Sequence, residues 1–483
     1  MSGVMAIVVA LGLLMYLAYR GVSLLILAPA LTALLALVSV DTPLLASYTQ
    51  VFMGAAGNFI VQFFPLFLLG AIFGKLMEDS GSAEVLARAI VQRLGDARGI
   101  LAVVLACAVM TYGGVSLFVV AFAVYPIAAA LFRQADLPKR LIPGTIALGA
   151  FTFTMTALPG TPAIQNAIPM PYFGTSPFAA PGLGIITGLL MLMMGQAWLS
   201  YRAGQAHAAG EGYGDHGDAS PEFDRELREH AAGEGFDVME VPPEVKPRDL
   251  PPLSLALMPI VLVIVLNLVF TTLVMPAMNT DYLAEPRYGA TGLDSVRGVW
   301  SVISALVIAI LFLIATNMKR LPRVKETLDS GANASLVPIF NTASLVGFGS
   351  VVASLAAFGM ISDWVTSLGG DNPLISLAIA VNVLAGMTGS ASGGMSIALS
   401  TLGETYVAMG QAAGISPELM HRVTAVATGG LDALPHNGAV ITLLSICGLT
   451  HRQAYLDIAV VAVLVPILSL VVLIALGTLM GTF

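Results

Sequence analysis

Ten apolar runs constrain the fold of this chain more than any other feature of its sequence. An α-helix needs about 20 apolar residues to cross a hydrocarbon core of about 30 Å, and each run approaches or exceeds that length. The runs cover residues 4–19, 21–40, 58–77, 141–158, 182–200, 253–275, 298–316, 336–360, 423–448 and 455–480. Only 10% of the residues are charged, whereas soluble domains carry about 25%. The sequence therefore predicts an all-α membrane protein with about ten transmembrane helices.

Two further apolar stretches, residues 99–132 and 374–412, have glycine-rich centres. We interpret each as a re-entrant hairpin, in which two half-helices meet at GGVS (113–116) or at GSASGGMS (389–396). Non-helical backbone at membrane depth is tolerated only where it is buried in protein or lines a watery cavity. We therefore expect both hairpin tips to face a cavity inside the protein.

Two short motifs recur in the same order in the two halves of the chain. GGVS (113–116) is echoed by GGMS (393–396), and ALPGTP (157–162) by ALPHNG (433–438), at offsets of 280 and 276 residues. These matches predict two repeats, and because each half has five crossings, the second repeat is inverted in the membrane. Broken apolar segments at corresponding places in two such halves indicate a transporter's binding site.

The repeats define the expected domains. The first repeat is 1–202, with scaffold spans in 1–80 and a hairpin and broken span in 99–170. The second repeat is 251–483, with scaffold spans in 253–360, a hairpin in 374–412 and a broken span in 423–448. Between them lies an acidic loop, 203–250, whose twelve Asp and Glu against four Lys and Arg account for the whole net charge of −8. The acidity therefore describes one flexible connector and gives no reason to expect a nucleic-acid partner.

Lysine and arginine residues test the proposed topology. If the loop at Arg20 is cytoplasmic and the crossings alternate, 18 of the 21 Lys and Arg residues are cytoplasmic, and only Arg287, Arg297 and Arg422 lie in outside loops. This asymmetry follows the positive-inside rule. We therefore expect a multi-pass protein of a bacterial inner (cell) membrane, with both termini outside and the loop 203–250 in the cytoplasm.

The hairpin tips are the first candidate substrate site. A half-helix that begins at mid-membrane points unpaired N–H groups and the positive end of its dipole into the cavity, which attracts a carboxylate without a fixed cation. The candidate residues are Gly114, Ser116, Ser390, Ser392, Gly393 and Ser396. The alternative is that these small residues only allow close helix packing.

The broken spans supply the other candidates. In the first, we expect Thr156, Thr161 and Asn166 to bind substrate oxygens, although residues from Gln165 onward also fit a polar turn at the outer surface. In the second, we expect Asn437 to contact the substrate. Prolines in both segments prevent continuous helix and free backbone carbonyls.

Three ionisable residues are candidates for carrying a coupling proton. Asp432 and His436 fall within an apolar crossing, where an ionisable group is a functional hypothesis by default. Glu404, two turns beyond Ser396, is the third candidate. The alternative is that Asp432 caps a broken helix and that His436 is only hydrogen-bonded. No Lys or Arg falls in the middle of an expected span, which favours a small monocarboxylate over a multiply charged anion.

The stretches GGVSLFVVAFAVYPIAAALF (113–132), ALPGTPAI (157–164), GSASGGMSIAL (389–399) and DALPHNG (432–438) resemble the gluconate permease (GntP) family of proton symporters. The resemblance implies import of gluconate or a related hydroxy acid such as 3-hydroxybutyrate, by an elevator mechanism in which hairpins and broken spans slide against a dimeric scaffold. Gluconate permeases have a more polar, FFEVGF-like segment where this chain has SLFVVAF (116–122), which implies a less hydroxylated substrate.

Two other functions fit parts of the pattern. A sodium/proton exchanger of the same superfamily would also use carbonyl-rich breaks, but the scattered hydroxyl and amide groups favour an organic substrate. The sodium-coupled dicarboxylate carriers of the superfamily have Ser-Asn-Thr at their hairpin tips, and this chain has none, which favours protons. A serine hydrolase is disfavoured because no nucleophile-elbow pattern surrounds Ser116 or Ser396. We therefore expect no enzyme activity, cofactor or metal, and we expect a carboxylate, the bilayer and a second copy of the chain as partners.

Overall fold

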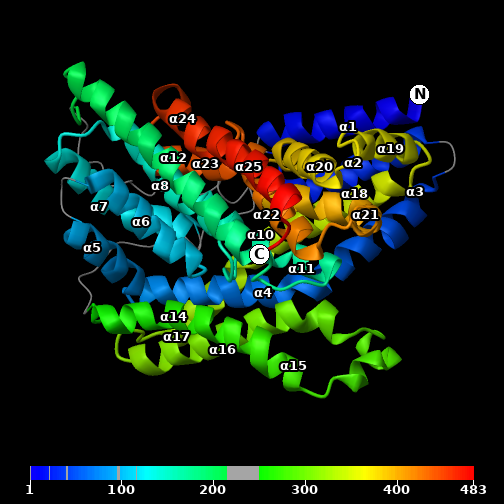
Figure 1. The fold of residues 1–483 in the computed structure, drawn as a ribbon, viewed down its shortest axis with the longest axis horizontal. Coiled ribbons are helices and arrows are strands. Elements are labelled where there is room, and N and C mark those ends of the chain that lie inside the picture. Colours follow the sequence, from blue (N-terminus) through cyan, green and yellow to red (C-terminus); the bar gives the residue numbers. More distant parts are fainter. Residues whose placement is uncertain (1, 21, 40–41, 95–97, 116, 215–249) are drawn as a thin grey trace.

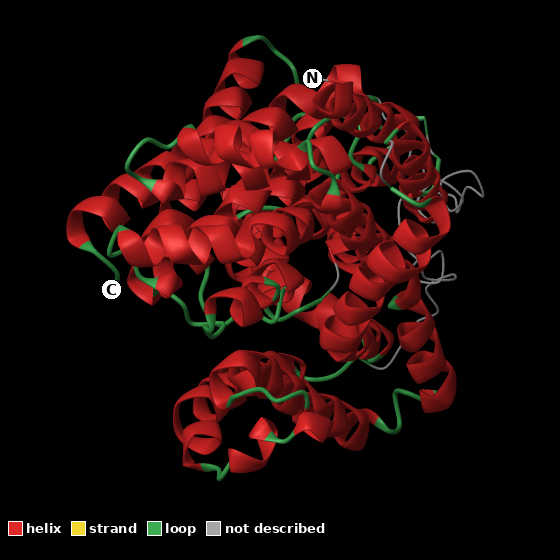
Figure 2. Cartoon of the chain, turned by 90° about the vertical axis from the view of Figure 1, so that its right-hand side faces the viewer, coloured by secondary structure: helices red, strands yellow, loops and turns green. Residues whose placement is uncertain are grey.

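The computed structural model describes residues 2–20, 22–39, 42–94, 98–115, 117–214 and 250–483. Across these ranges the regular elements are all helices, and no strand is present (Figure 2). Ser116 and residues 215–249 of the acidic loop lie outside the described residues, so the structure does not test their predicted roles.

Six described helices are long and apolar enough to cross a membrane, namely Leu44–Asp79, Pro181–Ala208, Leu253–Ala277, Leu293–Asn317, Val324–Ser354 and His451–Met480. Shorter apolar helices include Gly3–Ala18, Leu24–Val38, Gly99–Tyr112 and Pro373–Thr388. These lengths support a multi-pass, all-α membrane protein, and the number of ten crossings stays a prediction.

Each half of the chain begins with a series of helices, and several helices of the second half pack against α4. The first half starts with α1 (Ser2–Tyr19), α2 (Leu24–Val38), the continuous helix formed by α3 (Leu44–Ala46), η1 (Ser47–Phe52) and α4 (Met53–Asp79), and α5 (Ser82–Leu94). The second half starts with α14 (Leu253–Val269), η5 (Phe270–Val274), α15 (Met275–Ala277), α16 (Leu293–Asn317), α17 (Val324–Ala334), α18 (Leu336–Ser354) and α19 (Phe358–Ser367). In Figure 1, α14, α16 and α17 form a layer below α4, and α4 contacts α16, α17 and α18.

Each half then forms a helical hairpin close to its predicted position. The first consists of α6 (Gly99–Tyr112) and α7 (Leu117–Gln134), and the second of α20 (Pro373–Thr388) and α21 (Ala391–Ala412). Figure 1 shows the two hairpins toward opposite ends of the long axis of the molecule. Gly114 (φ 92°) and Gly389 (φ 61°) occupy the left-handed region in the two turns, which glycine adopts with little steric cost.

The second hairpin turn is shorter than the sequence predicts. The turn contains only Gly389 and Ser390, and α21 begins at Ala391, because the Ser390 side chain caps it by accepting a hydrogen bond from the Gly393 N–H (3.1 Å). Gly393, Gly394 and Ser396 therefore lie inside the helix. The expectation that GGMS, like GGVS, forms part of a turn is wrong, because the local capping by Ser390 starts the helix before the glycine pair.

Gly394 instead allows the two arms of this hairpin to touch. A Cβ atom built there would overlap the backbone of Ala385 in α20. We expect Gly394→Ala to separate the arms and to lower the free energy of unfolding by about 1–3 kcal/mol, the usual cost of overpacking. The control is Gly54→Ala in α4, where a Cβ would meet nothing within 4 Å. Thermal unfolding of the purified protein measures both, and equal midpoints for the two variants would contradict this packing role.

Both predicted breaks appear between helices. The first break separates α8 (Ile142–Ala150) and α9 (Phe153–Thr156) from α10 (Ile164–Ala167) and α11 (Pro169–Phe173). The next helix, α12 (Pro181–Ala208), extends beyond the expected repeat boundary at residue 202. The second separates α22 (Pro417–Leu431) from α23 (Gly438–Ile446), and α24 (His451–Ala459), η8 (Val460–Leu464) and α25 (Val465–Met480) complete the chain. The broken span thus starts at Pro417, before the expected residue 423.

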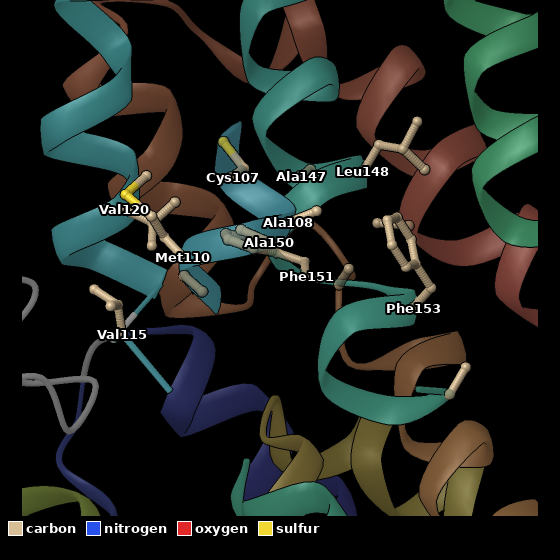
Figure 3. Packing of buried hydrophobic residues seen from close by; sticks show 14 of the residues in the cluster. Cys107, Ala108, Met110, Val115, Val120, Ala147, Leu148, Ala150, Phe151 and Phe153 are labelled. Atoms are coloured by element: carbon tan, nitrogen blue, oxygen red, sulfur yellow. The ribbon is translucent and has the colours of Figure 1, made fainter. Parts of the chain in front are cut away.

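Small residues bring the first hairpin onto the first broken span. In Figure 3, Cys107 and Met110 of α6 lie near Ala147 and Ala150 of α8. A Cβ at Gly149, on the same helix, would overlap Val104 and lie 2.6 Å from the Cβ of Cys107. Cys107 and Cys447 are both buried and free, which agrees with their predicted role as small residues of the core.

Candidate substrate cavity

In each half, the hairpin tip packs against the break of its own span. In the first half, the Tyr112 hydroxyl donates to the Pro159 carbonyl (2.6 Å), and a Cβ on Gly114 would lie 2.9 Å from Pro162. In the second half, the Asn437 amide donates to the Gly389 carbonyl (2.7 Å). The two kinds of interruption predicted from the sequence therefore come together in both halves.

A cavity of about 140 Å³ lies where these interruptions meet. The first half contributes Leu117 after its hairpin tip, Phe151 and Met155 before its break, and Gln165 after it. The second half contributes most of the polar lining, which consists of Asn341, Thr342, Thr388, Ser390, Ser392, Asp432 and Asn437. Gln165, for which a polar turn at the outer surface was the alternative, lines the cavity.

The start of α21 presents hydrogen-bond donors at the cavity wall. Ser390 and Ser392 both line the cavity, and their hydroxyl oxygens lie 3.4 Å apart. The first N–H groups of a helix have no partner within the helix, and the positive end of its dipole adds to their attraction for an anion. This wall can therefore bind a carboxylate or a hydroxyl oxygen without a cationic side chain.

Asn437 is largely committed to holding the second break. Its side-chain oxygen caps α23 by accepting from the N–H groups of Ala439 (2.7 Å) and Val440 (3.2 Å), while its amide nitrogen holds the hairpin tip at Gly389. The side chain lines the cavity and is 8% exposed. Asn437 therefore caps α23, and its predicted contact with the substrate stays a prediction.

Asp432 is the C-cap residue of α22 and also lines the cavity. Its Oδ1 atom is buried and has no hydrogen-bond partner within the described part of the chain. Asp457 in α24 is a contrast, because this buried carboxylate accepts hydrogen bonds from Arg140 (3.2 Å), Arg202 (2.9 Å) and Trp198 (3.0 Å). Asp432 is therefore a partly buried carboxylate whose Oδ1 atom is left to bind a proton or a ligand.

A buried network around Arg422 was missed by the sequence analysis. Arg422 is fully buried in α22, so its assignment to an outside loop is wrong. The guanidinium donates to the carbonyls of Ala179, Thr156 and Pro177 and to the side-chain oxygen of Asn166, at 2.8–3.5 Å. These contacts use all five N–H groups of an arginine, which leaves none for a substrate.

His421 and Asn166 complete this network. The Asn166 oxygen already accepts from Arg422, so the His421 Nε2 atom donates to it (3.2 Å), and the His421 Nδ1 atom accepts from the Thr175 hydroxyl (2.6 Å). The Asn166 amide nitrogen donates to the carbonyls of Thr161 and Pro177 (3.0 Å each). Asn166 is thus saturated with protein partners.

A local signal marks the start of α22 and could have placed Arg422 within it. Ser416 caps the helix by accepting from the Leu419 N–H (3.2 Å), Pro417 takes its first position and Glu418 its first turn. This sequence is typical of a helix N-terminus, whereas the apolar run begins only at residue 423.

The remaining candidates lie away from the cavity wall. Thr156 donates to the Thr152 carbonyl (3.1 Å) and Thr161 contacts the Tyr112 carbonyl (3.4 Å), while Gly114, Gly393 and the buried Ser396 pack among helices. His436 contacts the Gly386 carbonyl (3.0 Å), and Glu404 is exposed on α21. The structure therefore brings together Ser390, Ser392, Asp432 and Asn437 at the cavity. Contacts within the protein are present for Thr156, Thr161, His436, Gly114 and Gly393.

Comparison with known proteins points to transport. No family model matches the chain. It is 44% identical over 465 residues to the uncharacterized transporter YxjC of Bacillus subtilis, covering 94% of each chain, and 34% identical over 98 residues to an uncharacterized transporter of Haemophilus influenzae, covering 20% of this chain and 23% of that one.

Solved transporters share the fold. The YdaH transporter of Alcanivorax borkumensis superposes with a TM-score of 0.54 at 16% identity, covering 96% of this chain and 97% of that one. MtrF of Neisseria gonorrhoeae, described as illuminating a class of antimetabolite efflux pumps, gives 0.53 at 10% identity, covering 95% and 94%. At these identities the likeness concerns the fold alone, and the resemblance to gluconate permeases stays a prediction.

Proposed function

Because the chain belongs to the family of the transporter YxjC of Bacillus subtilis, we propose that it imports a small organic monocarboxylate by proton symport. The expected substrates are hydroxy acids such as gluconate or 3-hydroxybutyrate. One observation carries the proposal: the N-terminal end of α21, with Ser390 and Ser392, lines the same cavity as Asp432, whose Oδ1 atom has no hydrogen-bond partner among the described residues.

The cavity lining supports a singly charged substrate. No lysine or arginine of the described residues lines the cavity, and the buried Arg422 has no N–H group left to offer. A helix N-terminus with hydroxyl groups can hold one carboxylate. A second or third carboxylate would be buried without a compensating charge, which costs several kcal/mol.

Asp432 is the preferred proton carrier. It follows the C-terminal end of α22, whose dipole is negative there, and its Oδ1 atom has no partner in the described chain. Both features oppose a permanent negative charge, and an approaching carboxylate would oppose it further. Proton binding at Asp432 therefore accompanies substrate binding, with His436 as a second candidate and Glu404, which is exposed and outside the lining, as a weaker one.

We further propose an elevator built from two inverted repeats in a homodimer of a bacterial inner membrane. Supporting this, a hairpin, a broken span and a long final helix follow one another in each half, as α6–α12 and α20–α25. The cavity is lined both by residues of the hairpins and broken spans and by residues of α2 and α18. In the proposed motion, the hairpins and broken spans carry the substrate past these scaffold helices.

Uptake by proteoliposomes tests the proposed function. The purified protein should accumulate labelled 3-hydroxybutyrate or gluconate when the vesicle interior is more alkaline than the outside, and a protonophore should abolish the accumulation. Empty vesicles provide the control. Movement of protons driven by a sodium gradient, with no uptake of either acid, would contradict the proposal and indicate an ion exchanger.

Ser392 provides a test of the anion-binding wall. Ser392→Ala should raise the half-saturating substrate concentration about two- to tenfold, because it removes one hydrogen bond of about 0.5–1.5 kcal/mol. Ser400→Ala is a matched control on the same helix, since the Ser400 hydroxyl bonds the Ile397 carbonyl and lies outside the lining. Concentration-dependent uptake measures both, and the same half-saturation in Ser392→Ala and the wild type would show that this hydroxyl only packs.

A further inference from the structure

Asn341 is a buried amide at the cavity wall with unused hydrogen-bonding capacity. It lies on α18, lines the cavity and is 5% exposed. Neither its amide nitrogen nor its amide oxygen has a hydrogen-bond partner within the described residues. Other buried asparagines near the breaks differ, because Asn166 and Asn437 use both ends of their amides in hydrogen bonds to the protein. Asn341 therefore requires a partner that the described protein does not supply.

The chemistry of the amide defines that partner. The Asn341 nitrogen needs an acceptor and its oxygen needs a donor. A carboxylate only accepts, so a simple fatty acid would leave the oxygen buried and unsatisfied. A hydroxyl group of the ligand can donate its O–H to the Asn341 oxygen. The Asn341 nitrogen can then donate to a lone pair of the same hydroxyl oxygen or of the ligand's carboxylate. We propose that Asn341 recognises a hydroxyl group of the transported acid, an inference that rests on the proposed transport function.

The neighbouring residue places Asn341 close to the proposed carboxylate site. Thr342 Oγ1 lies 3.4 Å from Ser392 Oγ at the start of α21, and the Thr342 hydroxyl also donates to the Pro338 carbonyl (3.0 Å). The wall formed by α21 thus meets α18 at the cavity. In the proposed arrangement α21 binds the carboxylate and α18 binds the hydroxyl, so a helix outside both hairpins determines which acids are accepted.

The test compares acids that differ by a single hydroxyl group. The pairs are 3-hydroxybutyrate with butyrate and lactate with propionate, and calorimetry on the purified full chain measures the dissociation constant of each. The wild type should bind the hydroxy acid of at least one pair about fivefold or more tightly than its analogue, because the analogue leaves a buried acceptor unpaired. Asn341→Ala should bring that ratio close to one, and Asn341→Ser, which keeps a hydroxyl, should retain part of it.

Asn382→Ala is the matched control. Asn382 is also buried, and its amide oxygen also lacks a partner within the described chain, but it lies outside the cavity lining. Its substitution should leave the ratio unchanged. An unchanged ratio in Asn341→Ala overturns the role of Asn341 even if vesicles still accumulate the hydroxy acid. If the wild type neither binds nor accumulates any of these acids, the proposed function fails and this inference fails with it.

Discussion

Asp432→Asn is expected to abolish proton-driven accumulation of the substrate while the protein remains folded. The substitution preserves the size of a residue that caps α22 and lines the cavity, but an amide cannot take up and release a proton in the physiological range. The carrier should therefore still exchange internal for external substrate, without concentrating it. Measuring both net uptake under a pH gradient and exchange of labelled substrate at equal pH separates the two effects.

Glu404→Gln is the control for this experiment. Glu404 is exposed on α21 and does not line the cavity, so its loss should leave accumulation near the wild-type level. If Asp432→Asn accumulates substrate as the wild type does and Glu404→Gln does not, the coupling proton is carried by Glu404. If both variants accumulate substrate, neither residue carries it.

Arg422→Leu is expected to prevent stable folding. Its guanidinium donates to the buried carbonyls of Ala179 and Thr156, and it shares the Pro177 carbonyl and the Asn166 oxygen with other donors. Each buried polar group left unpaired costs about 1–3 kcal/mol. A loss of about 3 kcal/mol or more is a large part of the stability of most proteins. Arg422→Lys should be partly tolerated, because an ammonium group keeps the charge but offers only three donors.

The unfolding temperature of the purified protein, followed by size-exclusion chromatography, measures this effect. Arg287→Leu is the matched control, because the Arg287 side chain is 69% exposed and its contacts are with the exposed Glu285 and the ring of the exposed Tyr288. Its loss should change the free energy of unfolding by less than about 1 kcal/mol. If Arg422→Leu kept the wild-type stability but failed to bind substrate, Arg422 would be a substrate-binding residue.

Local sequence signals account for the parts of the fold that could be predicted. Glycine and proline disfavour helix within apolar runs, and both hairpins and both breaks occur in segments that are rich in these residues. The signal is imprecise, because Gly393 and Gly394 lie inside α21. The pairing of each hairpin tip with the break of its own half is a tertiary contact that this local pattern does not predict. It is seen at Gly114 against Pro162 and at Gly389 against Asn437.

Long-range packing decides the features that could not be predicted. Thr156, Thr161 and Asn166 are polar residues at a break, as Asn437 is, yet they lie outside the cavity lining, and the Arg422 network holds the Thr156 carbonyl and Asn166. That network joins residues more than 240 positions apart in the chain, so no local pattern reveals it. Asn341 was missed for a related reason, because a single asparagine in an apolar helix has no distinguishing neighbour in the sequence.

A density map of the full chain in a lipid nanodisc, prepared with the acid that vesicles accumulate, tests the location of the binding site most directly. We predict density for one acid molecule in the cavity that Asp432 also lines, with the carboxylate of the acid at the start of α21 near Ser390 and Ser392. Density at another site, with this cavity empty in the presence of saturating acid, would contradict the account.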